Sequence, residues 1–597
     1  MPVRVAVLTE GGYPYVQGEV AGWCDRLLRG LHSHEFEVYA LSRSRRQEQA
    51  GRVPLPGNVV GVREAGLWDA PGRGTEAAAM PYGRRVRRRF RAEFGALADA
   101  VCRPVVELRD GAGQSGRVAP VEDRFSRALH GLAALAAEHG GLSAALRSED
   151  ALHVLESACR RAGAPRVVQS AQVPDLLAVA ARLERALRPL SLDWYGASGT
   201  AGLAAADLVH AVGAGPAVLP GLLAKRNLGT PLLLTEYSVR LREHFLHGAG
   251  DAGVLAVAGA RAPVRAVLAA FQQLLVREAY RTADLITPGN AHTRRWQERC
   301  GAPAERLRTV HPGMDASPYA ELGEAADERP GTAVLTWVGR LAPAKDVVTL
   351  LHALVRVRER VPGTRLRIVA DHGSDAGYAA HCRAVAAGLF PDEATGASGE
   401  GRNPVSFEGA LPGPGCRARQ PASRADAFAG EGPVVLSSVV EGFPVPLVEA
   451  MFCARATVAT DVGAVCEVVG GTGLVVPPRN PAALADACAS LLLDPQRRAR
   501  LGAAARARAL ELFTVEQNVE AFRGIYLELI SRRSDGPPRT RATRPFAVTP
   551  ETHLCAHGEE GPATPPPQVP TWARSSRAAS PVPVGTARTA RRGGGHG

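Results

Sequence analysis

Short apolar segments that alternate with helix-like stretches constrain the fold of this 597-residue chain more than any other feature. Strands that alternate with helices in this way predict a parallel, doubly wound sheet. The alternation occurs twice, on either side of an acidic stretch over residues 316–332. The sequence therefore predicts an α/β protein with two Rossmann-like doubly wound domains that face each other across a cleft. Strands are expected at residues 3–8, 36–41, 206–212, 231–237, 283–288, 306–311, 333–340, 366–370, 405–407, 434–440, 456–460 and 473–477.

The same pattern sets the domain organisation. We expect a first domain over residues 1–318 and a second over 319–530, whose last helix crosses back to the first domain. Residues from about 70 to 205 have helical spacing and are too long for a loop, so they predict a helical insertion in the first domain. Residues 534–597 are rich in Pro, Arg and Ser, which predicts a disordered tail.

Composition excludes several classes of protein. No charge-free apolar stretch reaches about 18 residues, so we expect no integral membrane segment. The first residues lack the sections of a signal peptide, which predicts a cytoplasmic protein. The ten cysteines are scattered without metal-ligand spacing, so neither a disulfide framework nor a metal site is expected.

The net charge of +12 is a weak argument for a nucleic-acid partner. Ten Arg and four acidic residues after residue 530 account for half of it, and a second concentration lies at Arg84–Arg91. Neither region is interleaved with an aromatic platform or belongs to a helix-turn-helix pattern. We therefore expect no binding to nucleic acid.

Two loops after predicted strands could bind phosphate. Gly11 and Gly12 lie in a Gly/Pro-rich loop that precedes a helix from about Glu19, although the loop is not G-x-G-x-x-G. In V-G-R-L-A-P-A-K, Arg340 and Lys345 follow a strand and could neutralise a diphosphate. The chain holds only two lysines, but an ordinary solvated pair remains an alternative for these two cations.

Two carboxylates flank another strand-to-helix turn. The segment E-G-F-P-V-P-L-V-E runs from Glu441, at the end of a predicted strand, to Glu449, early in the next helix. Carboxylates at the carboxyl edge of a parallel sheet can accept hydrogen bonds from sugar or ribose hydroxyls. The alternative is an ordinary exposed helical glutamate, because Glu449 falls off the apolar stripe of Leu447, Val448 and Met451.

In the first domain, His210, Glu236, Tyr237 and His311 are polar residues near strand ends. Of these, His210 is the best placed for a catalytic role. A histidine in such a position is more often a core residue with both nitrogens satisfied.

The motifs G-R-x-x-x-x-K, E-G-F-P-x-P-L-x-E-A-M and A-T-D-V-G-A, in this order, resemble the donor domain of retaining glycosyltransferases of family 4, the group 1 glycosyltransferases. The opening T-E-G-G-Y-P-Y-V-Q-G, with V-H-A-V, L-L-L-T-E-Y and D-L-I-T-P-G-N, is similar to the Pel-type exopolysaccharide glycosyltransferases, which have a long N-terminal domain. The resemblance covers most of residues 1–530.

This resemblance implies that a hexose, glucose from UDP-glucose, is transferred with retention to a glycan or other hydroxyl acceptor. It implies no obligatory metal and no cofactor besides the donor. A role in exopolysaccharide synthesis would bring association with a membrane polysaccharide-export complex. The alternatives are a non-catalytic nucleotide-sugar-binding scaffold subunit and a sugar epimerase of the same fold.

The resemblance also assigns roles to residues. Arg340 and Lys345 would neutralise the donor diphosphate, Glu441 would hold the sugar and Glu449 the ribose hydroxyls. The candidate catalytic residues are Glu441, Arg340, Lys345 and His210. The candidate donor-binding residues are Gly11, Gly12, Gly339, Arg340, Lys345, Glu441, Gly442, Phe443, Pro444, Leu447 and Glu449.

Four positions differ from the family pattern. Glu19 stands where the Pel-type loop has a second Gly, and Tyr237 replaces a histidine after Thr-Glu. Asp371-His372-Gly373 replaces a Gly-Pro-type turn after the second strand of the donor domain. Residues 411–430 are irregular before the E-G-F-P motif.

Overall fold

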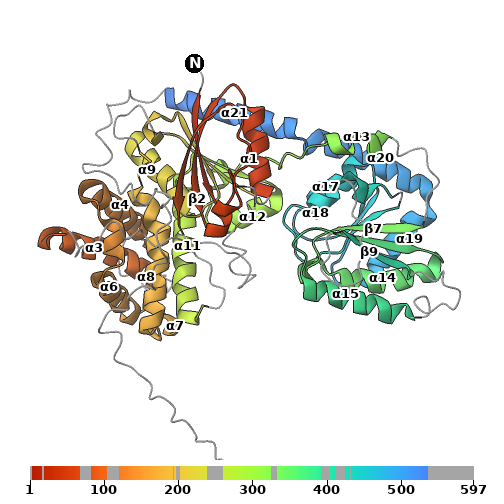
Figure 1. Cartoon of the computed structure of the whole chain (residues 1–597), viewed down its shortest axis with the longest axis horizontal. Helices are drawn as coiled ribbons and strands as arrows, with labels where there is room; N and C mark the ends of the chain where they lie inside the picture. The colour runs from red at the N-terminus through yellow and green to blue at the C-terminus, as the bar shows by residue number, and fades with distance from the viewer. Residues whose placement is uncertain are drawn as a thin grey trace, which may run out of the picture.

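The computed structural model describes residues 3–15, 19–67, 82–103, 120–192, 194–195, 202–237, 239, 260–324, 333–391, 403–409, 424–430 and 432–534. Within these residues the chain forms two six-stranded sheets in which every strand pairing is parallel (Figure 1). The predicted disordered tail, apart from its first residue, lies outside the described residues.

Both sheets have the same strand order, 3-2-1-4-5-6 within each domain. In spatial order the first consists of β3 (Val59–Gly66), β2 (Glu35–Ser42), β1 (Arg4–Glu10), β4 (Leu208–Val212), β5 (Leu232–Glu236) and β6 (Leu285–Pro288). The second consists of β12 (Leu474–Val476), β11 (Thr457–Thr460), β10 (Val434–Leu436), β7 (Val334–Gly339), β8 (Arg365–Ala370) and β9 (Val405–Gly409). This order is that of a Rossmann fold, so the predicted pair of doubly wound domains is confirmed.

The prediction of a strand at residues 306–311 was wrong. Only an isolated bridge joins Leu307 to Ile286 there.

Helical layers cover both faces of the first sheet, and successive side chains of each strand point into one layer and then the other. Val5 and Val7 face the layer that contains α1 (Glu19–Gly30). Ala6 and Leu8 face a larger helical layer on the other side. This two-sided burial explains why the strand reads as a nearly continuous apolar run.

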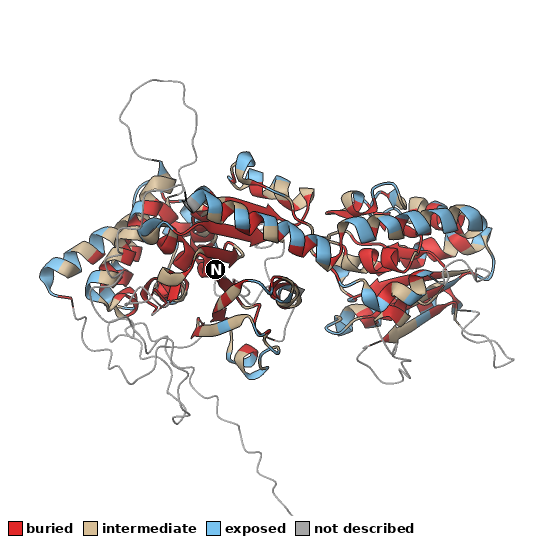
Figure 2. Cartoon of the chain, turned by 90° about the horizontal axis from the view of Figure 1, so that it is seen from above, coloured by how far each residue is buried: buried red, intermediate tan, exposed pale blue. Residues whose placement is uncertain are grey.

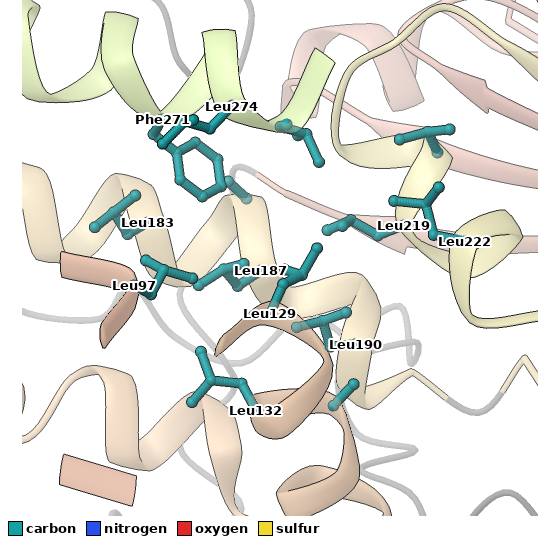
Figure 3. Close-up of a cluster of buried hydrophobic side chains, with 14 of the residues drawn as sticks. Leu97, Leu129, Leu132, Leu183, Leu187, Leu190, Leu219, Leu222, Phe271 and Leu274 are labelled. Carbon is teal, nitrogen blue, oxygen red and sulfur yellow. The ribbon is translucent and has the colours of Figure 1, made fainter. Parts of the chain in front are cut away.

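The predicted helical insertion forms much of that larger layer. Its helices are α3 (Arg84–Cys102), α4 (Val121–His139), α5 (Leu142–Leu146), α6 (Glu149–Arg160), α7 (Arg166–Gln169) and α8 (Val173–Leu187). They share one apolar core with the sheet and with α9 (Leu219–Leu228) and α11 (Ala262–Thr282). Figure 3 shows Leu97, Leu129 and Leu183 of the insertion in the same cluster as Phe271 of α11. The insertion is therefore packed onto the first sheet and shares its core.

The last helix, α21 (Val515–Ser534), returns to the first sheet (Figure 1). Its Phe522 and Tyr526 are fully buried in the cluster that contains Trp23 of α1. The Trp23 Nε1–H donates to the Asn518 side chain over 3.1 Å. Burial of these apolar side chains of α21 holds the C-terminal part of the described chain on the first domain. Figure 2 shows the buried and exposed sides of the helices.

The second sheet is also covered on both faces. One face packs on α14 (Val347–Arg360), α15 (Ala376–Leu389) and α19 (Pro481–Leu493). The other packs on α17 (Val445–Phe452), α18 (Val465–Val469) and α20 (Pro495–Leu512). The remaining α-helices among the described residues are α2 (Arg45–Gln49), α12 (Ala291–Arg299) and α13 (Ala320–Glu324). None of the helices in the described residues is long and apolar enough to cross a membrane.

Candidate active site

Most of the predicted donor residues lie at or after the ends of β7 and β10, the two central strands of the second sheet. The chain leaves these neighbouring strands in opposite directions along the sheet, which makes their carboxyl ends the topological switch point. Open α/β sheets bind ligands at this point, because the loops diverge there and leave a crevice. Arg340 and Lys345 come from the first loop and Glu441 from the second.

Hydrogen bonds between the two loops fix their relative position. Lys345 ends a 3₁₀ turn, Pro343–Lys345, and its carbonyl accepts from the Ser437 hydroxyl over 2.8 Å. The Val439 amide donates to the carbonyl of Ala344 over 2.9 Å. This bond explains why β10 ends at Leu436, whereas the sequence predicted a strand to Val440. Glu441 therefore stands in a loop rather than at the end of a strand.

Lys345 and Glu441 form a direct ion pair. The Lys345 Nζ lies 2.8 Å from one Glu441 carboxylate oxygen and 2.6 Å from the other. Their side chains are 18% and 9% exposed, so the pair is partly shielded from water. Charge-assisted bonds of this kind orient both groups. The structure thus joins the residue expected at the phosphate to the residue expected at the sugar.

Arg340 has a different environment. It directly follows Gly339, whose φ of 155° is a conformation that side chains with a Cβ rarely adopt. The Arg340 side chain is exposed, and the described part of the chain offers it neither an ion pair nor a hydrogen bond. Its guanidinium is therefore available to an anionic ligand at the same strand end as Lys345.

The loop between Glu441 and α17 is held by the A-T-D-V-G-A motif. The carbonyl of Gly442 accepts from the Ala464 amide over 3.1 Å. Gly463 has φ 60°, and a Cβ there would lie 2.3 Å from the carbonyl oxygen of Glu441. Only glycine fits this turn, both for its left-handed backbone and for the close approach.

The other residues of the E-G-F-P motif are structural in this state. The Phe443 ring packs edge-on against Phe513, with centroids 5.7 Å apart. Pro444 precedes the first residue of α17, and Leu447 is buried in the core below the helix.

Glu449 is buried, in contrast to the exposed helical glutamate that the sequence left open. Its side chain is 8% exposed. One carboxylate oxygen accepts from the Tyr319 hydroxyl over 2.9 Å, and the other accepts from the Arg424 Nη2 over 2.7 Å. The sequence prediction missed both partners. Two signals were available: the unusual Asp371, which also pairs with Arg424, and the irregular stretch over residues 411–430, which contains Arg424.

Gly11 and Gly12 lie at the equivalent place in the first sheet, after β1 and beside β4. Gly11 has φ 67°, and its amide donates to the carbonyl of Leu41 over 2.9 Å. Among the described residues neither glycine has a hydrogen bond to the second domain. A contact between the domains instead joins the Ala291 amide, at the start of α12, to Glu467 of α18 over 2.6 Å.

His210 is a core residue, the alternative that the sequence left open. It is 1% exposed, and its ring nitrogens lie 2.8 Å from the Tyr526 hydroxyl and 2.6 Å from the Thr235 hydroxyl. Burial lowers the pKa of His210 to about 3. A neutral, enclosed imidazole with both nitrogens occupied cannot meet a substrate, so His210 has no part in the site that we describe.

This burial predicts a pH dependence of stability. An unfolded histidine titrates near pH 6.5, so between there and about pH 3 the unfolded chain binds one proton more at this position. The contribution of neutral, buried His210 to the unfolding free energy is complete above pH 6.5. Below pH 6.5 it falls by about 1.4 kcal/mol per pH unit. We expect His210→Asn to flatten the fall in the unfolding free energy between pH 6.5 and 5, measured by urea denaturation. His153→Asn, at an exposed histidine, should leave the slope unchanged.

The described residues contain no group of three or more His, Cys, Asp or Glu side chains that could hold a metal ion. The charged groups at the switch point are instead two cations and a carboxylate from two adjacent loops. Such an arrangement suits an anionic ligand that also carries hydroxyl groups.

Comparison with known proteins agrees with this class of site. Residues 332–494, which include both loops, match the family model described as "Glycosyl transferases group 1". Alpha-maltose-1-phosphate synthase from Mycolicibacterium smegmatis is 30% identical over 322 residues, 51% of this chain and 76% of that protein. The fold and these matches place the chain among the group 1 glycosyltransferases. Residues 3–305 match a second model, and through it the chain belongs to the family described as "Domain of unknown function (DUF3492)".

Other similar proteins match shorter or more divergent regions. D-inositol 3-phosphate glycosyltransferase from Kribbella flavida is 32% identical over 218 residues, which are 34% of this chain and 47% of that protein. The chain thus spans about half the length of that relative. Anabaena HepE, solved in complex with UDP and glucose, is 15% identical with a TM-score of 0.45, and the match covers 88% of this chain and 99% of that chain.

Proposed function

We propose that the protein is a retaining, nucleotide-sugar-dependent hexosyltransferase. Its donor is UDP-glucose and its acceptor is a hydroxyl group of a glycan, in exopolysaccharide synthesis of the Pel type. The sequence resemblance supports the donor, the retention and the Pel type. The group 1 family match and the basic strand end after β7 support a nucleotide-sugar donor.

The observation that carries the proposal is the contact between Lys345 and Glu441. In a nucleotide sugar, the diphosphate and the sugar are joined at the anomeric carbon. A protein site for this bond therefore needs a cation for the phosphate directly beside a hydrogen-bond acceptor for the sugar hydroxyls. Lys345 and Glu441 are 2.6 Å apart at the switch point, which is this combination.

The same groups would assist the reaction. When the bond from the anomeric carbon to the diphosphate breaks, the electron pair leaves with the nucleoside diphosphate and negative charge grows on phosphate. Lys345 and Arg340 stabilise that charge, and cations that are already held in place lower the barrier most. Glu441 keeps the Lys345 ammonium oriented and accepts from the sugar hydroxyls. Glu449 accepts from the ribose hydroxyls at the other end of the donor.

A mass-spectrometric screen of nucleotide sugars tests the proposal. We expect the protein to consume UDP-glucose, slowly as hydrolysis and faster when a glycan acceptor is present. Retention is checked by the anomeric configuration of the product. Tight UDP binding without turnover would favour a scaffold subunit, and an altered sugar without transfer would favour an epimerase. The proposal would be contradicted if the protein neither bound nor consumed any nucleotide sugar.

A further inference from the structure

The environment of Glu449 contains more charge than the proposed ribose contact requires. Arg424 approaches the Glu449 carboxylate side-on, with its Nε 3.0 Å from Oε1 and its Nη2 2.7 Å from Oε2. Its third nitrogen, Nη1, forms an ion pair with the Asp371 carboxylate. The Tyr319 hydroxyl, from a segment 130 positions earlier in the sequence, donates a hydrogen bond to Glu449 Oε1.

This cluster joins two of the places where the sequence differs from its family pattern. Asp371 directly follows β8, where a Gly-Pro-type turn was expected. Arg424 lies in the irregular stretch before β10. The structure places the side chains of these two residues in contact, so the positive charge of Arg424 is balanced in part by the negative charge of Asp371. The Asp371 amide also donates to the carbonyl of Gly339 over 2.9 Å, beside Arg340.

Arg424 is fixed at its base as well as at its tip. It precedes a 3₁₀ turn, Ala425–Phe428, whose Ala427 carbonyl accepts from the Arg367 side chain over 3.0 Å. Arg367 belongs to β8 and also pairs with Glu408 at 2.8 Å. The Arg424 guanidinium lies 6.0 Å from the centre of the Phe428 ring. These contacts limit the movement of Arg424 away from Glu449.

Electrostatics keeps the cluster charged. Burial alone would lower the pKa of Arg424, but its bonds to Glu449 and the negative charge of Asp371 outweigh burial and raise that pKa. Arg424 is therefore a permanent cation beside Glu449. Breaking such a pair by removal of one partner leaves a buried charge without compensation.

We propose that Arg424, oriented by Asp371, is the positioning residue that holds Glu449 for the ribose of the donor nucleoside. The Arg424 Nε is shared between Oε1 at 3.0 Å and Oε2 at 3.1 Å, Nη2 adds a bond to Oε2, and Tyr319 adds one to Oε1, so the protein holds both oxygens. A ribose hydroxyl would take the place of the shared Nε bond on Oε2. The inference rests on the proposed function, because it names the positioning residue of that same donor site. Arg424 acts through Glu449 and needs no contact with the substrate.

A double-mutant cycle separates this role from general stabilisation. UDP binding would be measured by calorimetry for the wild type, Arg424→Gln, Glu449→Gln and the double variant. We expect Kd to rise about tenfold or more in each single variant, as for a lost bond to a charged group. The double variant should bind no more weakly than Glu449→Gln, because Arg424 acts through the carboxylate.

Further variants check the direction of the effect. Arg424→Lys should recover part of the affinity, and Asp371→Asn should weaken it less than Arg424→Gln does. In turnover, Arg424→Gln should raise the donor KM more than it lowers kcat, because the ribose is remote from the bond that breaks. Arg360→Gln breaks an exposed ion pair with Asp486 in the same domain and is the matched control, with no expected change.

Several results would overturn the inference. One is an additive loss of affinity in the double variant, and another is an unchanged Kd in Arg424→Gln. Tighter UDP binding by Arg424→Gln would also overturn it, because it would show that Arg424 competes with the ribose. If Arg424→Gln does not fold, Asp371→Asn and Tyr319→Phe are tested in the same cycle with Glu449→Gln. A wild type that binds and consumes donor while the cycle fails would contradict only the inference. A wild type that neither binds UDP nor consumes any donor would contradict the proposed function as well.

Discussion

Replacing Lys345 with alanine is expected to lower kcat for sugar transfer by about 10²–10³-fold, which corresponds to about 2.7–4 kcal/mol of barrier. The reason is that the Lys345 ammonium is a fixed positive charge at the point where the leaving diphosphate gains negative charge. The loss should appear in kcat and in kcat/KM alike, because the interaction strengthens as the bond breaks. Steady-state kinetics with UDP-glucose and an acceptor would measure it.

The chain provides its own control for this substitution. Its only other lysine, Lys225, pairs with Asp284 at 2.6 Å in the first domain. Lys225→Ala removes the same side chain and also breaks an ion pair, but away from the switch point. We expect near-wild-type kcat in this variant. Equal losses in the two lysine variants would show that Lys345 matters only for the fold.

The second large effect is expected for Glu441→Gln. The amide has nearly the same size but no charge, so it holds the Lys345 ammonium less firmly and binds the sugar hydroxyls more weakly. We expect kcat/KM to fall by about 10²-fold, on the scale of a lost bond to a preorganised charged group. Kinetics of Glu441→Gln, Lys345→Ala and the double variant would measure this loss.

The combined variant makes the prediction specific. Because the two side chains are bonded at 2.6 Å, their effects should not add, and the double variant should be little worse than Lys345→Ala. Asp486→Asn removes a carboxylate from an exposed ion pair of the same domain and should have no effect. Fully additive losses would mean that Lys345 and Glu441 act independently.

The sequence predicted those parts of the fold that local patterns determine. The apolar run of β1 and the helical spacing of α3 to α8 arise from side-chain periodicity within one segment, which a single sequence contains. The end of β10 was misplaced because Val439 and Val440 are β-branched and apolar, yet their amides bond to Ala344 of another loop. Propensity does not determine a partner that is distant in sequence.

The charge pattern of the candidate site was harder to predict. The sequence identified Arg340, Lys345 and Glu441 as residues of one strand edge, and the structure brings Lys345 and Glu441 together. It did not identify Arg424 or Tyr319 as partners of Glu449, because these residues come from segments 25 and 130 positions away. The position of His210 was also predicted incorrectly. It lies in the middle of β4 rather than near a strand end, and Tyr526 of α21, 316 positions away in the sequence, bonds to its ring.

The measurement that tests the account most directly is hydrogen exchange by mass spectrometry with and without UDP-glucose. If the donor binds where β7 and β10 end, exchange should slow in peptides that contain residues 339–346 and 437–444. We expect no change over α15, which packs on one face of the same sheet. Unchanged exchange in both loops, or protection confined to the first domain, would contradict the account.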